Sequence, residues 1–272
     1  MTGKDMQTLR QQRKDAFAKF YDINEDKRFL DMLNENQDRR NLDFLRNPVM
    51  YNIYSYLVNY LFDFYSLWTR DDQSQDCKSV PRVLDWGCGH GQVSYLLKKC
   101  GFDVVSCDIS STAQFTKTDP IILAKNISIT ELTDDSKLPF QNGEFDIVVS
   151  FGVIEHVKDD LASLKEIKRI LKPGGLFFCV HLPSKLSWTQ RISRFRGNCC
   201  HDRLYLKNEV KNLLKETNLN LIDMWHRSLL PKNTLIPPAF HLAEKADLWL
   251  CRNTPLKFFA TNIEFIAEKP CN

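Results

Sequence analysis

Asp85 is followed at alternate positions by three glycines, Gly87, Gly89 and Gly91, at the end of an apolar run. Glycine adopts backbone angles closed to other residues, and it lets a ligand approach the main chain closely. Residues 92–99 have the composition of a helix, whose first N–H groups would face such a ligand. A strand, a glycine turn and a helix N-terminus therefore predict a cradle for a nucleotide-like ligand.

The spacing of the glycines separates two kinds of nucleotide site. A dinucleotide fold requires G-x-G-x-x-G, and the position of its third glycine is occupied here by Gln92. With the acid in front, the pattern is instead D-x-G-x-G-x-G. A glycine-rich run also occurs in plain tight turns, so the motif needs support from the rest of the chain.

Further segments follow the glycine turn in a regular order. Residues 102–108 are typical of a strand, and they end in Asp108, where a nucleoside-binding α/β fold places a carboxylate on the ribose hydroxyls. An acidic segment at 134–140 precedes an apolar strand at 143–150. Residues 168–178 then combine the end of a helix, a Pro-Gly-Gly turn and another strand.

In this order, the segments resemble the class I S-adenosyl-L-methionine (SAM) methyltransferases over residues 80 to 182. The loop at 151–157 (FGVIEHV) is similar to that of the type 11 branch, which includes quinone-biosynthesis enzymes. The resemblance implies an α/β fold with a doubly wound, mostly parallel seven-stranded sheet of the Rossmann-like kind. It also implies SAM as the cofactor. The cofactor-binding residues that it implies are Asp85, Gly87, Cys88, Gly89, Gly91, Asp108, Ile109, Asp134, Asp135 and Phe151.

Histidines are the candidates for catalysis, because imidazole can take a proton from a hydroxyl acceptor near neutral pH. His156 follows the fourth strand at the edge where open α/β sheets bind ligands, and it either contacts the acceptor or supports its own loop. His181 occupies the corresponding place after the fifth strand. These two histidines are the predicted catalytic residues. His201 and Tyr205 precede another helix, and we expect them to contact the acceptor.

An aromatic helix is predicted at 49–68, within a charged helical extension that spans residues 1–80. Its strongly polar residues recur at helical spacing along one stripe, and they are Asn52, Ser55, Asn59, Asp63 and Ser66. Such a helix is half-buried rather than membrane-spanning. Its apolar face either packs on the sheet or encloses the acceptor through Tyr54 and Tyr65. Contact with a membrane surface is a third interpretation.

The methyltransferase domain is predicted to span residues 81–272, with acceptor specificity in the segment 182–257. Basic side chains outnumber acids between residues 185 and 215. They form either a solvated face or a site for an anionic acceptor that carries a phosphate or a carboxylate. The elements expected in this part are helices at 209–217 and 239–250 and strands at 219–224 and 258–267, the last antiparallel at the sheet edge.

Composition narrows the class of protein. A net charge of +3 over 272 residues is too small to indicate a nucleic-acid partner by itself. The nine cysteines form no C-x-x-C pair, and Cys199-Cys200-His201 lacks a second ligand pair, so no metal site is expected. The first residues contain no apolar stretch of a signal peptide, and free thiols suit a reducing compartment, so we expect a cytoplasmic protein.

The expected function is SAM-dependent methyl transfer to a small molecule, at a hydroxyl or carboxylate oxygen. Two alternatives stay open: a nucleic-acid or protein methyltransferase, and a SAM-binding protein that transfers nothing. Amino-group methylators of bases and glutamines carry an Asn/Asp-Pro-Pro-aromatic motif after the fourth strand, where this chain has Ser150-Phe151-Gly152-Val153. We therefore expect a small-molecule acceptor, no nucleic acid and no stable membrane insertion, whereas the oligomeric state is not indicated.

Overall fold

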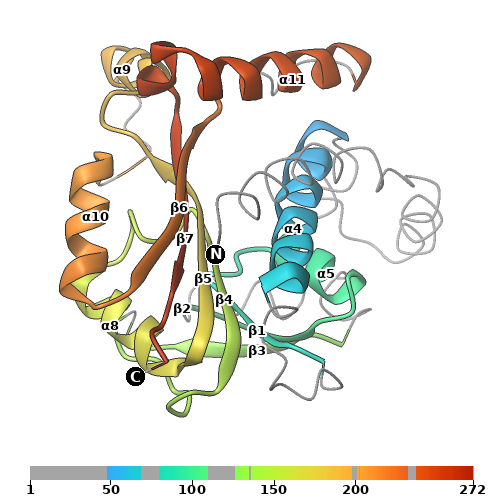
Figure 1. The fold of residues 1–272 in the computed structure, drawn as a ribbon, viewed down its shortest axis with the longest axis vertical. Helices are drawn as coiled ribbons and strands as arrows, with labels where there is room; N and C mark the ends of the chain where they lie inside the picture. The colour runs from blue at the N-terminus through green and yellow to red at the C-terminus, as the bar shows by residue number, and fades with distance from the viewer. Residues whose placement is uncertain are drawn as a thin grey trace.

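The computed structural model describes residues 48–68, 80–109, 126–134, 136–197, 201, 203–231 and 237–271. Seven strands in these ranges form one sheet in the order β3-β2-β1-β4-β5-β7-β6 (Figure 1). The strands are β1 (Arg82–Trp86), β2 (Asp103–Ile109), β3 (Ser128–Leu132), β4 (Phe145–Phe151), β5 (Leu171–Pro183), β6 (Asn220–Arg227) and β7 (Asn262–Glu268). Strands β1 to β5 pair in parallel, whereas β7 is antiparallel to both neighbours. The mostly parallel sheet is as predicted.

Helices cover both faces of the sheet, which makes the fold doubly wound (Figure 1). One face carries α4 (Pro48–Trp68) and α5 (Gln92–Lys99), and the other carries α8 (Asp160–Ile170) and α10 (Lys207–Glu216). Each face has its own buried apolar cluster, because the central strands are apolar on both sides, as parallel strands require. Two further helices, α9 (Trp188–Phe195) and α11 (Pro237–Asn253), lie beyond the carboxyl ends of β5 and β6.

Helix α4 contributes buried side chains to the core, whereas its other described side chains are half-buried or exposed. Leu61 and Phe64 pack in the same buried cluster as α5 and the sheet, which confirms that the apolar face packs on the sheet. Part of the predicted polar stripe, however, is buried: Ser55 and Asn59 are buried, and the Cys100 thiol after α5 donates to Asn59 Oδ1 at 3.7 Å, whereas Asp63 and Ser66 are half-buried. A polar pair inside a helical interface thus replaces one part of the predicted exposed stripe. Residues 1–47 lie outside the described part, and the domain boundary at residue 80 stays a prediction.

The C-terminal strand corrects one expectation about topology. Strand β7 is antiparallel as predicted, but it lies between β5 and β6, so β6 forms the sheet edge. Ile263, Phe265 and Ala267 of β7 are fully or almost fully buried and demand an interior place, whereas most of β6 is half-buried. Before β7, residues 255–259 form the 3₁₀ helix η2 (Pro255–Phe259) instead of strand.

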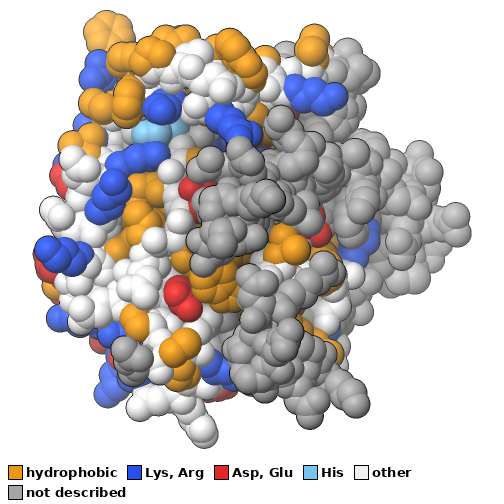
Figure 2. Space-filling view, in the orientation of Figure 1, with side chains coloured by type: hydrophobic (Ala, Val, Ile, Leu, Met, Phe, Trp, Pro, Cys, Tyr) orange, Lys and Arg blue, Asp and Glu red, His pale blue; other side chains and the backbone are white. Residues whose placement is uncertain are grey.

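The end of the molecule above the sheet carries many exposed apolar side chains. Hydrophobic side chains gather along the upper edge in Figure 2, over α9 and α11, and the exposed ones in this part of the chain include Phe195 of α9, Leu242 and Trp249 of α11, and Phe258 of η2. Among the described helices, none is both long and apolar enough to cross a membrane.

Candidate active site

The glycine turn joins β1 to α5 and is anchored to the neighbouring strand. The N–H groups of Gly87 and Cys88 both donate to the carbonyl of Cys107 in β2, at 2.9 and 3.1 Å. Gly87, Gly89 and Gly91 all have positive φ angles, of 71°, 53° and 79°. A Cβ atom at Gly87 would lie 2.5 Å from Val153 Cγ2, so the fold itself requires glycine there. A Cβ atom at Gly89 would meet nothing closer than 4.0 Å, because this glycine borders open space.

That open space is a cavity of about 440 Å³ at the carboxyl ends of β1, β2 and β4, which we call the glycine-turn cavity. It brings together most of the predicted site residues. Those that line it are Tyr54, Asp85, Gly87, Cys88, Gly89, Asp108, Ile109, Phe151 and His156. Gly91 lies just behind it as the N-cap residue of α5.

Two carboxylates give the glycine-turn cavity a negative character. Asp108 accepts hydrogen bonds from the N–H groups of Gly89 and Ile109, both at 2.7 Å. Asp85 is almost completely buried and accepts from the Ser94 hydroxyl at 2.5 Å. Burial raises the pKa of Asp85 to about 7, and repulsion from Asp108 adds to the effect. Burial also raises the pKa of Asp108. A cationic ligand in the cavity would stabilise the ionised form of both carboxyl groups.

Aromatic rings close the side of the cavity next to α4. The ring of Tyr54 lies 5.9 Å from that of Phe151 and 5.7 Å from that of His181, between centroids. His181 has a left-handed backbone, with φ of 62°, where the register between β5 and β7 shifts. Burial, and then the charge of Asp85, raises the pKa of Tyr54. The predicted catalytic residue His181 therefore packs against the two aromatic rings of this wall, Tyr54 and Phe151, but does not itself line the cavity.

The loop after β4 places an acid and two histidines together. One side-chain ligand atom from each of Glu155, His156 and His201 lies within 4.8 Å of the others. Glu155 is buried, its side-chain oxygens have no hydrogen-bond partner among the described residues, and burial raises its pKa to about 7. His201 Nδ1 lies 3.8 Å from Glu155 Oε1. This Glu155–His156–His201 cluster has the chemistry to pass a proton, or to hold a divalent cation such as Zn²⁺ with positions left for a substrate.

Three further predicted site residues do not line the glycine-turn cavity. Tyr65 packs against the ring of Phe102, 6.5 Å away between centroids, and is absent from the lining of the cavity. The Tyr205 hydroxyl is buried and donates to Asp160 Oδ2 at 3.0 Å, so it supports the loop between β4 and α8, and Tyr205 does not line the glycine-turn cavity.

The third of these residues is Asp134, which is predicted to contact the cofactor. Its exposed carboxylate accepts from the N–H and hydroxyl of Ser136, at 2.9 and 2.7 Å, and does not line the glycine-turn cavity. A local turn therefore uses this acid. Leu132, at the end of β3, lines the cavity in its place. Asp135 lies outside the described residues.

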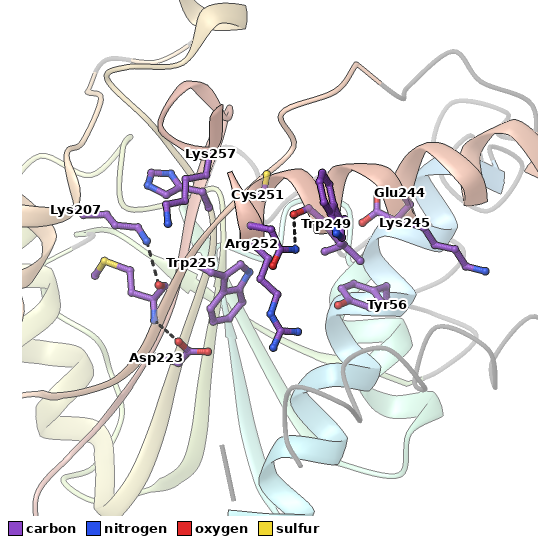
Figure 3. Close-up of a pocket in the computed structure, with 14 residues that line it drawn as sticks. Tyr56, Lys207, Asp223, Trp225, Glu244, Lys245, Trp249, Cys251, Arg252 and Lys257 are labelled. Carbon is purple, nitrogen blue, oxygen red and sulfur yellow. Dashed lines mark hydrogen bonds between the residues drawn. The ribbon is translucent and has the colours of Figure 1, made fainter. Parts of the chain in front are cut away.

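Sequence reasoning did not single out Glu155 as a candidate site residue, because its neighbour His201 lies far along the chain with no motif spacing between them. It also missed a second cavity, of about 900 Å³, which we call the β6–α11 cavity (Figure 3). Lys207, Trp225, His226 and Lys257 are among its lining residues. Every residue that lines it, except one tyrosine of α4, belongs to the segment 182–257, where acceptor specificity was predicted.

Comparison with known proteins agrees with this geometry. The model of a family described as a methyltransferase domain matches residues 58–224. A ubiquinone biosynthesis O-methyltransferase from Cereibacter sphaeroides is 30% identical over 156 residues, which cover 52% of this chain and 61% of that protein. A protein of the same name from Parvibaculum lavamentivorans is 37% identical over 103 residues, which cover 37% of this chain and 40% of that one. The chain thus spans less than two thirds of these relatives' length.

A solved structure supports the fold. The SAM-dependent methyltransferase from Methanosarcina mazei matches with a TM-score of 0.53 and 18% identity, over 72% of this chain and 95% of that chain. At this identity the likeness establishes a shared architecture, which is the one predicted from the glycine motif and the segments that follow it.

Proposed function

The chain belongs to the methyltransferase-domain family, and we propose from this that it transfers a methyl group from SAM to an oxygen atom of a small-molecule acceptor. The observation that carries the proposal is the glycine-turn cavity, which unites open glycine backbone, two carboxylates and His156 in one space. The two curated relatives are named O-methyltransferases, which supports oxygen as the accepting atom.

The proposed donor site uses the carboxylates and Gly89. SAM supplies a methyl group made electrophilic by its sulfonium charge. Asp108 accepts two backbone N–H groups, and a carboxylate has room for about four hydrogen bonds in all, so it can also accept from ribose hydroxyls. Asp85 offers the negative charge that suits the cationic methionyl end. Gly89 leaves the cofactor space that any side chain would fill.

The proposed acceptor chemistry is an in-line transfer with removal of one proton. The oxygen–methyl bond forms as the sulfur–methyl bond breaks, and the electron pair of the broken bond stays on sulfur. His156 takes the proton of a hydroxyl acceptor, with Glu155 and His201 behind it. The aromatic wall of Tyr54 and Phe151, supported by the ring of His181, excludes water and restricts the orientation of the acceptor, which is most of what this reaction requires of a protein.

Calorimetric titration with SAM and with its demethylated product tests the donor site. A screen of phenols and carboxylic acids with methyl-tritiated SAM then tests transfer. We expect saturable SAM binding and label transfer to an oxygen acceptor. A folded protein that binds neither SAM nor its product would overturn the proposal. Label found on nitrogen or carbon would overturn the assignment to oxygen.

Chelation separates the two chemistries open to the Glu155–His156–His201 cluster. Turnover that survives chelator treatment but is lost in His156→Ala supports proton transfer by His156. Turnover that disappears on chelation and returns with a divalent cation would instead assign the cluster to a metal site.

We also propose a cytoplasmic location. All six cysteines within the described ranges are free thiols, and Cys88, Cys107, Cys179 and Cys251 are buried. Such thiols persist in a reducing compartment. Fractionation of cells that express the tagged protein tests this proposal.

A further inference from the structure

The β6–α11 cavity holds two lysines that lie close to each other. Lys207 begins α10 and Lys257 lies in η2, and Figure 3 shows their amines converging on the same part of the cavity. Lys207 donates to the carbonyl of Met224 at 3.1 Å, which leaves other N–H groups of its ammonium available. Burial first, and then repulsion from Lys257, lowers the pKa of Lys207 to about 8. Two ammonium groups in this setting are stabilised by an anion.

A buried histidine lies next to these lysines without a polar partner. His226 is only 6% exposed, and neither ring nitrogen has a hydrogen-bond partner in the part of the chain that the structure describes. Its ring packs edge-on against Phe258, with centroids 5.7 Å apart. Burial, followed by the charges of Lys207 and Lys257, lowers its pKa to about 4, so it is neutral and carries one N–H donor. Buried donors are nearly always paired, so this one points to a missing ligand.

The acidic residues that line the cavity do not prevent an anion from binding there, and its apolar walls suit the rest of a small molecule. Glu244 is paired with Arg227 at 3.0 Å, and Asp223 accepts from the N–H of Met224 at 2.9 Å, so both acids are already engaged. Trp225 and Trp249 add flat apolar surface. A few polar groups among apolar walls, in a cavity of this size, are typical of small-molecule sites.

The position of the cavity relates it to the methyl-transfer site. It lies at β6, whereas the glycine-turn cavity lies at β1, β2 and β4. The sheet order puts three strand steps between β4 and β6, or roughly 14 Å at the usual spacing of neighbouring strands. Helix α4 borders both spaces, through Tyr54 in one and Tyr56 in the other. One elongated molecule can therefore occupy both.

We propose that the β6–α11 cavity binds the anionic end, a phosphate or a carboxylate, of an elongated acceptor whose apolar body lies against Trp225 and Trp249. Lys207 and Lys257 hold the anion, and His226 donates to it. That the bound molecule is the methyl acceptor rests on the proposed function. The anion site itself can be tested without turnover.

The test measures the binding of 1-naphthyl phosphate and 1-naphthoate to the full chain by isothermal titration calorimetry, with neutral 1-naphthol as the reference. We expect the anions to bind more tightly than naphthol. Lys207→Met and Lys257→Met should each lower the affinity for the anions by about tenfold or more, with little effect on the affinity for naphthol. Lys211→Met, an exposed lysine on α10 that does not line the cavity, is the matched control. The tighter of the two anions identifies the charged group.

Equal affinity for naphthol and both anions, or anion binding unaffected by either lysine variant, would overturn the inference. The same titrations with SAM-saturated protein should give unchanged anion affinity, and displacement of SAM by the probe would place it in the wrong cavity. If the lysine variants do not fold, the imidazole signals of His226 in the unaltered chain, assigned through their loss in His226→Gln, should shift with the probe. Failure to bind SAM would overturn the methyl-transfer proposal alone, and loss of anion binding in a SAM-binding protein would overturn only this inference.

Discussion

Gly87 and Gly89 lie two residues apart, but a side chain at each position would have a different effect. Both have left-handed backbone, which costs an alanine about 1 kcal/mol or more. Gly87→Ala adds a collision with Val153, so we expect a further loss of stability. Gly89→Ala should keep the fold with only the backbone cost, but its methyl group would project into the cofactor space. Urea denaturation and SAM titration of both variants check this, and equal loss of SAM affinity in two equally stable variants would contradict it.

Asp108 provides a second test at the residue scale. Asp108→Ala removes a carboxylate that we expect to accept from ribose hydroxyls, so SAM affinity should fall by about 1.5–3 kcal/mol. Because this carboxylate also holds the N–H of Gly89, Asp108→Asn serves as the companion variant: it keeps the shape but not the charge. Unchanged SAM affinity in a folded Asp108→Ala protein would refute the assignment.

Asp85 links the cofactor site to the pH dependence of stability. Its pKa of about 7 in the folded protein lies above the unfolded value of about 4. Between these values the folded state binds more protons, so its stability falls as the pH rises through this window and is constant above it. Asp85→Asn removes the titrating carboxyl group and with it this contribution to the pH dependence of stability. Relative to that variant, the unliganded protein should lose roughly 2–4 kcal/mol between about pH 4 and pH 8, measured by urea denaturation. A constant difference across this range would show that the carboxyl titrates normally.

At the scale of elements, an ionic network fixes α11 over the sheet. Arg227 at the end of β6 pairs with Glu244 of α11 at 3.0 Å and lies 3.8 Å from Glu264 of β7, and its guanidinium stacks on the ring of Tyr56 in α4. All three charged groups are buried. One arginine therefore ties four elements together around the β6–α11 cavity.

Removal of Arg227 leaves two buried carboxylates without their cation. Arg227→Met should therefore lower the free energy of unfolding by about 3–5 kcal/mol, whereas Arg227→Met combined with Glu244→Met should cost less than the sum of the single changes. Arg252→Met, an exposed arginine on α11, is the control and should change stability by less than about 0.5 kcal/mol. Urea denaturation measures all four variants, and additive effects would show that the pair does not interact.

The elements that could be predicted are those whose signal is local. Gly87 to Gly91 revealed the turn because the backbone angles are set by the residues themselves, and the apolar runs of β1, β2 and β4 report burial on both faces. The place of β7 could not be predicted, because it depends on how the crossover through α11 returns the chain. Glu155 and His201 were likewise invisible as a pair, since only the tertiary fold brings them together. Ser55 and Asn59 misled, because polar spacing does not reveal that both are buried, Asn59 beside Cys100 after α5.

At the scale of the whole molecule, α4 is the element on which both cavities depend. It sends Tyr54 to the glycine-turn cavity and Tyr56 to the β6–α11 cavity. Its Leu61 and Phe64 are buried in the same cluster as β1, β4 and β5. We therefore predict that the N-terminal segment divides functionally at the start of α4.

Two truncations test this division. Deletion of residues 1–47 should leave the fold and SAM affinity intact, because α4 and every described residue of the glycine-turn cavity remain. Deletion of residues 1–68 also removes Leu61 and Phe64, and the loss of each buried side chain costs about 2–5 kcal/mol, so the shorter chain should not fold cooperatively. Circular dichroism, thermal denaturation and SAM titration of both truncated chains test these expectations. If the first truncation folds but no longer binds SAM, the segment before α4 is part of the cofactor site.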